Sequence, residues 1–471
     1  MGIISPVPKS GDLSLDKHWR PVTLLPVMSK VFEKIMNQQL KQHLEQHRLL
    51  GSGQHAYRAN KSCQTALADL DAKILKALDQ GKYVGLLLVD MSAAFNVVAK
   101  EIVTPKLRRL GIGEFAVKLI ASYMSRRTSR VKIKGSLSEW ISVLTGIGEG
   151  SVIGPLVFII TIICVTIVLA RSIIKLKTLS ISAEVDNGSD KIDADVKLSS
   201  TEFADDVTGV TIAKTEKLVQ TSLQVMANEY KAYFGANGLK INVDKCEHIV
   251  LGQHRTITVV VDGRHEADSV KLLGVTFDKR YKFDKHIDKV TAKIATRNGQ
   301  LAKVSNIADT ETTKMLANAV VNSVAQYGCE IYGKDLKQIN RVQVKLNNTM
   351  RIILHAKWKT RIHDMLRELK WQKMVEMIQY NKIMLLKRIL STQASPYCMM
   401  MLKEGMMTHQ TKYAVREVEL RIAWCPKYTR TGSTSFIFTA VKLYNQVKIM
   451  GTKLKFESLR KHIKNKILSW R

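Results

Sequence analysis

Phe203-Ala204-Asp205-Asp206 is the stretch that decides the fold of this chain. It lies between two short runs of β-type residues, so it predicts the tip of a β-hairpin that carries two adjacent carboxylates. Neighbouring like charges repel, and a bound divalent cation would offset that repulsion, as in two-metal phosphoryl-transfer sites. Taken alone, the pair also fits an ordinary polar turn. A third carboxylate and a nucleic-acid-binding body are needed to decide between the two interpretations.

Asp90 supplies a candidate for the third carboxylate. It directly follows Val84–Val89, an almost wholly apolar run that is typical of a strand buried on both faces. A carboxylate at the end of such a strand is costly without a cation or a hydrogen-bond donor. The alternative is that Asp90 or Ser92 caps the helical segment that follows.

Charge is the second feature that points to a polyanionic partner. The 471 residues are enough for about three domains, and they carry 73 Lys and Arg against 41 Asp and Glu, a formal charge of +32. From Arg351 to Arg471 there are 25 basic and 7 acidic residues. This excess favours nucleic acid or an anionic membrane as partner, with strongly salt-dependent binding. The alternative is that the cations only solvate helix faces.

The cysteines and the longest apolar run narrow the class of protein. Cysteines 63, 164, 246, 329, 398 and 425 have no zinc-site spacing and are typical of reduced, intracellular thiols. Leu156–Ala170 is uncharged but shorter than the roughly 20 residues of a membrane span. It predicts a core helix after Gly154-Pro155. We therefore expect an intracellular protein, in nucleus and cytoplasm, without a membrane partner.

The remaining pattern alternates helices with short strands. Helical spacing predicts helices near 24–36, 67–78 and 214–234, and a helical region from about 286, which includes an apolar stripe formed by Ile339, Val342, Leu346, Met350 and Ile353. Loops are predicted at 51–58, at 146–151 and, because of its many acidic residues, at 181–200. Lys271–Phe277 predicts a single strand.

Several motifs in this order resemble the reverse transcriptases of non-LTR (LINE-type, Jockey-like) retrotransposons. Those that carry the resemblance are Trp19–Pro26 with Ser29–Lys34, Gln54–Ser62, Asp90–Phe95, Gly150-Ser151 with Gly154–Leu156, Phe203–Asp206, Asn237–Leu239 with Lys245, Leu273–Val275 and His286-Ile287. The match runs over about residues 5–290 and continues more loosely beyond.

The resemblance implies an α+β, right-hand polymerase fold. Fingers are expected at 1–80, a palm with an antiparallel sheet at 81–285 including the acidic loop 181–200, a helical thumb at 286–400, and a basic helical C-terminal region at 401–471. The implied activity is RNA-directed DNA polymerisation, which extends a primer 3′-hydroxyl on an RNA template by two-metal nucleotidyl transfer.

The resemblance also implies residue roles. Asp90, Asp205 and Asp206, with the backbone of Met91, would hold two Mg²⁺ ions, with Mn²⁺ as an alternative. Lys245 would donate a proton to the leaving pyrophosphate, or be a surface cation. Five residues would contact the nucleotide or its template pair: Arg58, Lys61, Phe95, Gly150 and Ser151. Phe95 matches the aromatic gate that excludes a ribose 2′-hydroxyl, although core packing is its alternative.

Departures from the family pattern leave a second hypothesis open. Gly148-Glu149 stands where the family has Pro-Gln, and Asn96 follows the gate where Asp is usual. Glu149 would repel template phosphates unless it points away or pairs with a cation. The alternative function is therefore a decayed remnant that only binds nucleic acid. No endonuclease is recognised in the sequence, so we expect one upstream in a full element or acting in trans. The expected partners are an RNA template, a DNA primer and dNTPs.

Overall fold

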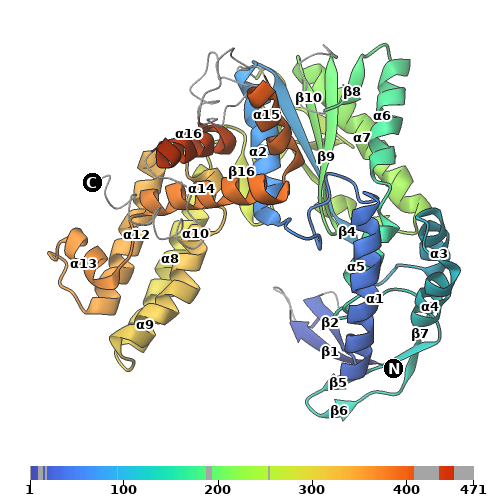
Figure 1. The fold of residues 1–471 in the computed structure, drawn as a ribbon, viewed down its shortest axis with the longest axis horizontal. Coiled ribbons are helices and arrows are strands. Elements are labelled where there is room, and N and C mark those ends of the chain that lie inside the picture. Colours follow the sequence, from blue (N-terminus) through green and yellow to red (C-terminus); the bar gives the residue numbers. More distant parts are fainter. Residues whose placement is uncertain are drawn as a thin grey trace.

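The computed structural model describes residues 2–8, 14–15, 18–92, 94–186, 194–252, 255–407 and 434–449. In Figure 1 the central sheet lies at the top, with α8, α9, α12 and α13 at lower left and α1, β1, β2 and β5 at lower right. Three parts of the predictions lie outside the described residues: Ala93, the centre of the acidic loop at 187–193, and 408–433 with 450–471 of the basic C-terminal region.

The N-terminal part forms a small sheet beside a long helix. Its strand order is β2-β1-β5-β6 with β7 on β5, from β1 (Gly2–Pro8), β2 (Trp19–Leu24), β5 (Arg127–Ile133), β6 (Ser136–Leu137) and β7 (Ile141–Val143). The helices are α1 (Val27–Gln46), α2 (Cys63–Asp79), α3 (Lys100–Arg109) and α4 (Glu114–Met124). Helices α1 and α2 confirm the two predicted near 24–36 and 67–78, with a loop between them.

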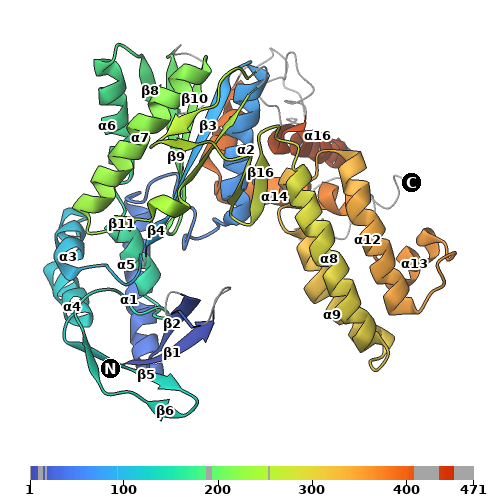
Figure 2. The ribbon, with the colours of Figure 1, turned by 180° about the vertical axis from the view of Figure 1, so that it is seen from behind.

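The central sheet has the order β12-β3-β10-β9-β8. Its strands are β12 (Glu247–Leu251), β3 (Tyr83–Val89), β10 (Asp206–Ala213), β9 (Val196–Phe203) and β8 (Ala183–Val185). In the interior strand β3, Val84 and Leu86 pack in the hydrophobic cluster that includes α2, and Leu87 and Val89 pack in the cluster that includes α7 (Glu216–Ala236). Figure 2 shows the ribbons of β3 and α7. Burial on both faces explains the continuous apolar run.

Two secondary-structure predictions are wrong. Residues 181–200 are not a loop at their ends, because β8 pairs parallel with β9 in the register Ala183↔Val196, and Glu184 pairs with Lys197 at 3.4 Å. Acidic composition masked this backbone pairing. Lys271–Phe277 is not one strand but a hairpin of β15 (Ser269–Leu272) and β16 (Val275–Asp278). Leu273 and Gly274 both have positive φ, the geometry of a two-residue hairpin turn.

The long apolar segment forms α5 (Gly154–Thr161) and α6 (Thr166–Thr178), separated by a turn. Among the described residues, Gly154–Thr178 is the one segment long and apolar enough to cross a membrane by length and composition, and 56% of its most apolar window is buried within the fold. Buried core helices pass the same test. Leu156, Phe158 and Ile160 of α5 are buried, which accounts for the apolar character of the predicted core helix.

A helical lobe follows the sheet. It comprises α8 (Asp284–Ser305), α9 (Thr310–Ala317), a π-helical turn (Asn318–Asn322), α10 (Ser323–Gln326), α11 (Cys329–Tyr332), α12 (Leu336–Leu354), α13 (Ile362–Leu369), α14 (Met374–Thr392), α15 (Pro396–Met407) and α16 (Phe436–Ile449). The stripe predicted on α12 is buried as expected. Buried Asp69 and Asp71 of α2 accept the backbone amides of Cys398 in α15 and Phe436 in α16, so both helix N-termini are held on α2.

Several short elements lie between or after the strands of the central sheet. They are β4 (Met91–Ser92), β11 (Lys240–Ile241), a 3₁₀ turn (Val243–Lys245), β13 (Val260–Val261) and β14 (Arg264–His265). Strand β4 pairs antiparallel with β11, and Asn242 N donates to Asp90 O at 2.9 Å. The chain after Gly238, whose positive φ forms the predicted turn, is thereby brought beside Asp90.

Candidate active site

The hairpin predicted from Phe203–Asp206 joins β9 and β10. Phe203 pairs with Asp206, which leaves a two-residue turn in which Ala204 has φ 59°. On the other side of β10, Val207 pairs with Val89 of β3. Asp206 and Asp90 each lie one residue beyond that pair, so the antiparallel register brings the carboxylates from distant parts of the sequence to one end of the sheet.

The three carboxylates influence one another electrostatically. Burial, and then the charge of Asp90, raise the pKa of Asp205. Burial, and then the charges of Asp205 and Asp90, raise the pKa of Asp206. Both effects disfavour the ionised forms. Asp90 Oδ2 is buried and has no hydrogen-bond partner among the described residues. A concentration of negative charge with an unsatisfied carboxylate oxygen is chemically suited to a divalent cation.

The donor set fits Mg²⁺ in type but is not drawn together around one point. Among the residues that the structure describes, no three His, Cys, Asp or Glu side chains form a group that could hold a metal ion. Carboxylate oxygens are nevertheless the ligands that hard cations prefer. Asp90, Asp205 and Asp206 are therefore suitable ligands whose side chains would have to close around an ion.

Lys245 lies beside this site. Its Nζ is 3.7 Å from Asp90 Oδ2, and its side chain is 69% exposed. Asp90, Asp206 and Lys245 line a cavity of about 110 Å³, which Lys271 of β15 also lines. The cavity thus brings together Asp90 from the end of β3, Asp206 from the hairpin and Glu247 of β12 with two cations, Lys245 of the 3₁₀ turn and Lys271 of β15.

Met91 and Phe95 continue from Asp90. Met91 is buried in β4 opposite Ile241. Phe95 is half-buried, and its ring stacks on that of Phe158 in α5 with centroids 4.9 Å apart. Its carbonyl accepts from Ile147 N at 2.7 Å. These contacts explain why Phe95 is held firmly, and they leave both the gate and the core-packing interpretation as predictions.

The loop with Gly150 and Ser151 docks on β2. A Cβ on Gly150 would lie 2.7 Å from Thr23 O, and its φ is +110°, so this position requires glycine. Ser151 is buried, and its hydroxyl accepts from Gly154 N at 2.7 Å at the start of α5. Glu149 pairs with Arg20 at 3.7 Å. The carboxylate that departs from the family pattern thus has a cationic partner.

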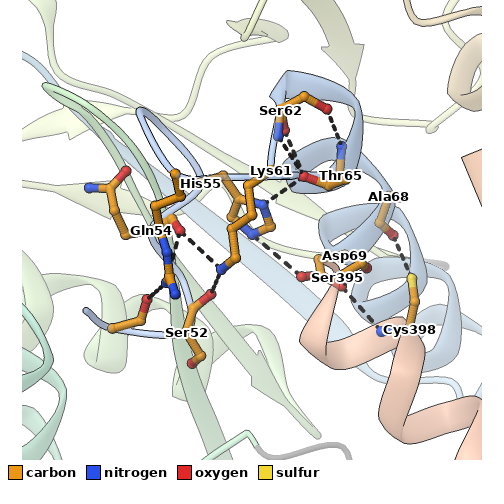
Figure 3. A network of polar contacts seen from close by, with 12 residues as sticks. Ser52, Gln54, His55, Lys61, Ser62, Thr65, Ala68, Asp69, Ser395 and Cys398 are labelled. Carbon is orange, nitrogen blue, oxygen red and sulfur yellow. Dashed lines mark hydrogen bonds and ion pairs between the residues drawn. The ribbon is translucent and has the colours of Figure 1, made fainter. Parts of the chain in front are cut away.

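Arg58 and Lys61 lie in a separate cluster in the loop before α2. The Arg58 guanidinium makes two bonds to Glu45, at 2.8 and 2.6 Å, and a third to Gly51 O. Lys61 Nζ donates to Ser52 O and Gln54 O, as Figure 3 shows. Burial, with the charge of Arg58, lowers the pKa of Lys61 to about 8. These contacts hold the loop, and a role on the triphosphate stays a prediction.

The sequence profile of the family described as reverse transcriptase (RNA-dependent DNA polymerase) matches residues 7–277, more than half of the chain. The chain belongs to the reverse transcriptase family. The predicted family and its α+β, right-hand polymerase fold are confirmed. The boundaries of fingers, palm, thumb and C-terminal region stay predictions.

This reverse transcriptase is similar to curated polymerases of transposable elements. It is 25% identical over 372 residues to the probable RNA-directed DNA polymerase from transposon BS of Drosophila melanogaster, covering 77% of this chain and 39% of the relative. For the polymerase from mobile element jockey of the same species the identity is 24% over 383 residues, covering 79% and 39%. The chain thus spans about two fifths of the length of these relatives.

Solved structures of telomerase show a more distant likeness. The apo enzyme of Candida tropicalis aligns with a TM-score of 0.43 and 9% identity, covering 98% of this chain and 68% of that one. The Candida albicans enzyme with a telomeric RNA fragment gives 0.40 and 11%, covering 87% and 62%. Scores this low add nothing to the family assignment.

Four residues of this reverse transcriptase were not singled out in the sequence. Glu33 of α1 is buried and accepts from Val152 N at 2.6 Å, so it caps the turn into α5. Arg20 pairs with Glu149, and its charge opposes the rise in the pKa of Asp205. Gln54 contacts the hairpin turn. Glu33, Arg20 and Gln54 lie inside motif stretches, and no sequence signal distinguished them from their neighbours. Lys271 was missed because its segment was wrongly predicted as a single strand.

A basic groove of about 680 Å³ adjoins the site. Its charged lining residues are Lys271, Lys289, Lys293 and Arg297, and it has no carboxylate in its lining. Lys289, Lys293 and Arg297 lie four residues apart on α8, so they share one face. Lys271 lines both this groove and the cavity of Asp90 and Asp206, so the groove and the carboxylate site of the reverse transcriptase share a lining residue.

Proposed function

We propose that this chain acts as the RNA-directed DNA polymerase of a non-LTR retrotransposon, extending a primer 3′-hydroxyl on an RNA template. The observation that carries the proposal is the grouping of Asp90, Asp205 and Asp206 at one end of the sheet, next to a groove lined only by cations among its charged residues. Polyanion binding and carboxylate-bound metal ions are the two requirements of nucleotidyl transfer.

Asp90, Asp205 and Asp206, with Met91 contributing through its backbone, would hold two Mg²⁺ ions. Such ions lower the pKa of the attacking hydroxyl and stabilise charge on the transferred phosphoryl group. Lys245, exposed beside Asp90, would move a proton toward the leaving pyrophosphate. The ion pair of Arg20 with Glu149 would compensate the carboxylate that could otherwise repel template phosphates.

The substrates follow from the same proposal. Phe95 would exclude a ribose 2′-hydroxyl, Gly150 and Ser151 would line the template pair through a tightly docked backbone, and Arg58 and Lys61 would contact dNTP phosphates after releasing their present partners. The template is RNA, the primer DNA and the metal Mg²⁺ or Mn²⁺. An endonuclease encoded upstream or supplied in trans, and action in nucleus and cytoplasm, complete the proposal.

Primer extension tests this function. Purified protein with Mg²⁺, a primed RNA template and dNTPs should extend the primer, and Asp205→Asn should lower the rate by at least about 10³-fold, because an amide is a much poorer ligand for a hard cation. Asp364→Asn, at a half-exposed position of α13 that pairs with Arg367, is the matched control. Equal extension by wild type and Asp205→Asn, or none by wild type, contradicts polymerase activity.

One observation favours the alternative of a remnant that only binds nucleic acid. The basic groove, lined by Lys271, Lys289, Lys293 and Arg297, would bind nucleic acid whether or not the carboxylates catalyse. On that alternative the protein binds primed RNA with a steep salt dependence and shows no Mg²⁺-dependent extension. The same assay, with binding measured in parallel, separates the two functions.

A further inference from the structure

The loop before α2 runs alongside the hairpin that carries Asp205 and Asp206. His55 N donates to Glu202 O at 2.8 Å, and Glu202 N donates to Gly53 O at 2.9 Å, so Gln54 and Glu202 form an isolated parallel bridge that ties the loop to β9. A Cβ on Gly53 would lie 2.7 Å from Ser200 O, which shows how closely the two backbones approach. This loop is therefore fixed relative to the turn at Ala204.

Gln54 makes the contact at the turn itself. Its side chain is buried, and Oε1 accepts from Ala56 N at 2.9 Å and from Ala204 N at 3.3 Å. In a two-residue hairpin turn the amide of the first central residue takes no part in the ladder, so it needs another acceptor. An amide oxygen has two lone pairs, and here both are used.

Ala204 has a conformation that benefits from such a partner. Its φ of 59° is unusual for a residue other than glycine and persists only where the surroundings define it. Asp205 and Asp206 follow directly, so the direction of their side chains depends on this turn. We propose that Gln54 is a positioning residue, which fixes the Ala204 turn through its side-chain oxygen and so fixes the backbone from which Asp205 and Asp206 would close around a metal ion. This inference rests on the proposed polymerase function.

The backbone of Gln54 and the residue after it make further hydrogen bonds. Lys61 Nζ donates to Gln54 O at 3.0 Å, while neighbouring His55 contacts Thr65 Oγ1 at 2.9 Å and Asp69 at 3.4 Å (Figure 3). Asp69 also accepts from Ser395 and from Cys398 N at 3.2 Å. The loop that carries Gln54 is thus held on α2 and the start of α15, which fixes the position of the Gln54 backbone.

Hydrogen–deuterium exchange of the turn amides tests the contact without any activity. Gln54→Met keeps length and volume but loses the oxygen, so the amides at 204–206 should exchange at least about tenfold faster, while β3 stays protected. Gln54→Glu keeps an acceptor and should retain wild-type protection. Gln54→Asn, which keeps the amide but shortens the reach, should show the faster exchange if Gln54→Met does not fold. Wild-type exchange in a folded Met or Asn variant overturns the proposal.

Activity supplies the second readout. Gln54→Met should lower kcat about tenfold or more and raise the half-saturating Mg²⁺ concentration several-fold, with unchanged affinity for primed RNA. Gln54→Glu should lie closer to wild type than Gln54→Met. Gln224→Met, the same substitution at a half-buried position of α7, is the control. A wild-type protein that never extends primers defeats the proposed polymerase, whereas the exchange result decides the role of Gln54 on its own.

Discussion

The ammonium nitrogen of Lys245 lies 3.7 Å from Oδ2 of Asp90, across a small cavity that Asp206 also lines. The 3₁₀ turn that ends at Lys245 follows directly on Asn242, whose amide donates to Asp90 O. The backbone hydrogen bond between Asn242 and Asp90 therefore places Lys245 beside Asp90, although the Lys245 side chain stays largely exposed. Such a side chain is free to move between Asp90 and a phosphate.

Lys245→Ala should lower kcat for nucleotide addition about 10- to 100-fold with little change in primer affinity, because a general acid contributes to the chemical step. Lys245→Arg keeps the charge but donates a proton poorly and should recover less than half of the lost rate. Single-turnover extension at several pH values measures this. Full activity of Lys245→Ala would assign Lys245 to the surface.

The ionisation of Asp205 makes a stability prediction for the metal-free protein. Burial and the charge of Asp90 raise its pKa, so the folded state holds this proton more tightly than the unfolded state. That contribution is present below the unfolded pKa and is lost as pH rises through the folded pKa. With EDTA at neutral pH, Asp205→Asn should thus raise Tm by about 1–2 °C.

The gain should shrink as the pH falls into the range where carboxylates protonate. Added Mg²⁺ should raise the Tm of the wild type more than that of Asp205→Asn, because it binds the folded site. Thermal melts at a series of pH values, with EDTA or Mg²⁺, provide the comparison. A lower Tm for Asp205→Asn in EDTA at neutral pH contradicts the repulsion that the structure shows.

The sequence predicted the carboxylate site better than its surroundings. Asp90, Asp205 and Asp206 were predictable because the apolar run of β3 and the turn signal between β9 and β10 are local patterns. The hairpin at Leu273-Gly274 was missed because an unbroken apolar run hides positive φ values. Gln54 and Glu33 were missed for another reason: their partners, Ala204 and Val152, lie more than a hundred residues away, and periodicity carries no information about such contacts.

The basic groove predicts a measurable salt dependence. Lys293→Gln removes one cation from the exposed face of α8, so it should weaken binding to a primed RNA a few-fold and reduce the slope of log K against log salt by about 0.9. Lys217→Gln, an exposed position of α7, is the control and should leave the slope unchanged. Identical slopes for both variants would place the nucleic acid elsewhere.

Phe95 and Phe158 allow the gate to be separated from core packing. If Phe95 excludes the 2′-hydroxyl, Phe95→Val should raise the use of ribonucleotides relative to deoxynucleotides by about tenfold or more. Phe158→Leu removes the stacking partner but keeps the ring at position 95, so it should lower stability without changing selectivity. Unchanged selectivity in Phe95→Val would leave core packing as its role.

Asp71 gives the strongest stability prediction. Its fully buried carboxylate accepts from Tyr281 OH at 2.8 Å, Lys334 Nζ at 2.5 Å and Phe436 N at 2.9 Å, joining α2 to the turn before α8, to the segment before α12 and to α16. Removing one partner of a buried ion pair strands the other, so Asp71→Asn should cost about 3–5 kcal/mol of unfolding free energy.

Burial lowers the pKa of Lys334, and Asp71 counteracts this effect. In Asp71→Asn, Lys334 should therefore lose its proton more readily, and the destabilisation should lessen as the pH rises. Guanidinium unfolding at pH 7 and pH 9.5 measures both effects, with Asp268→Asn, an exposed partner of Lys279, as the control that shifts little. Coincident unfolding midpoints for wild type and Asp71→Asn would show that the helices at the C-terminal side do not depend on this carboxylate.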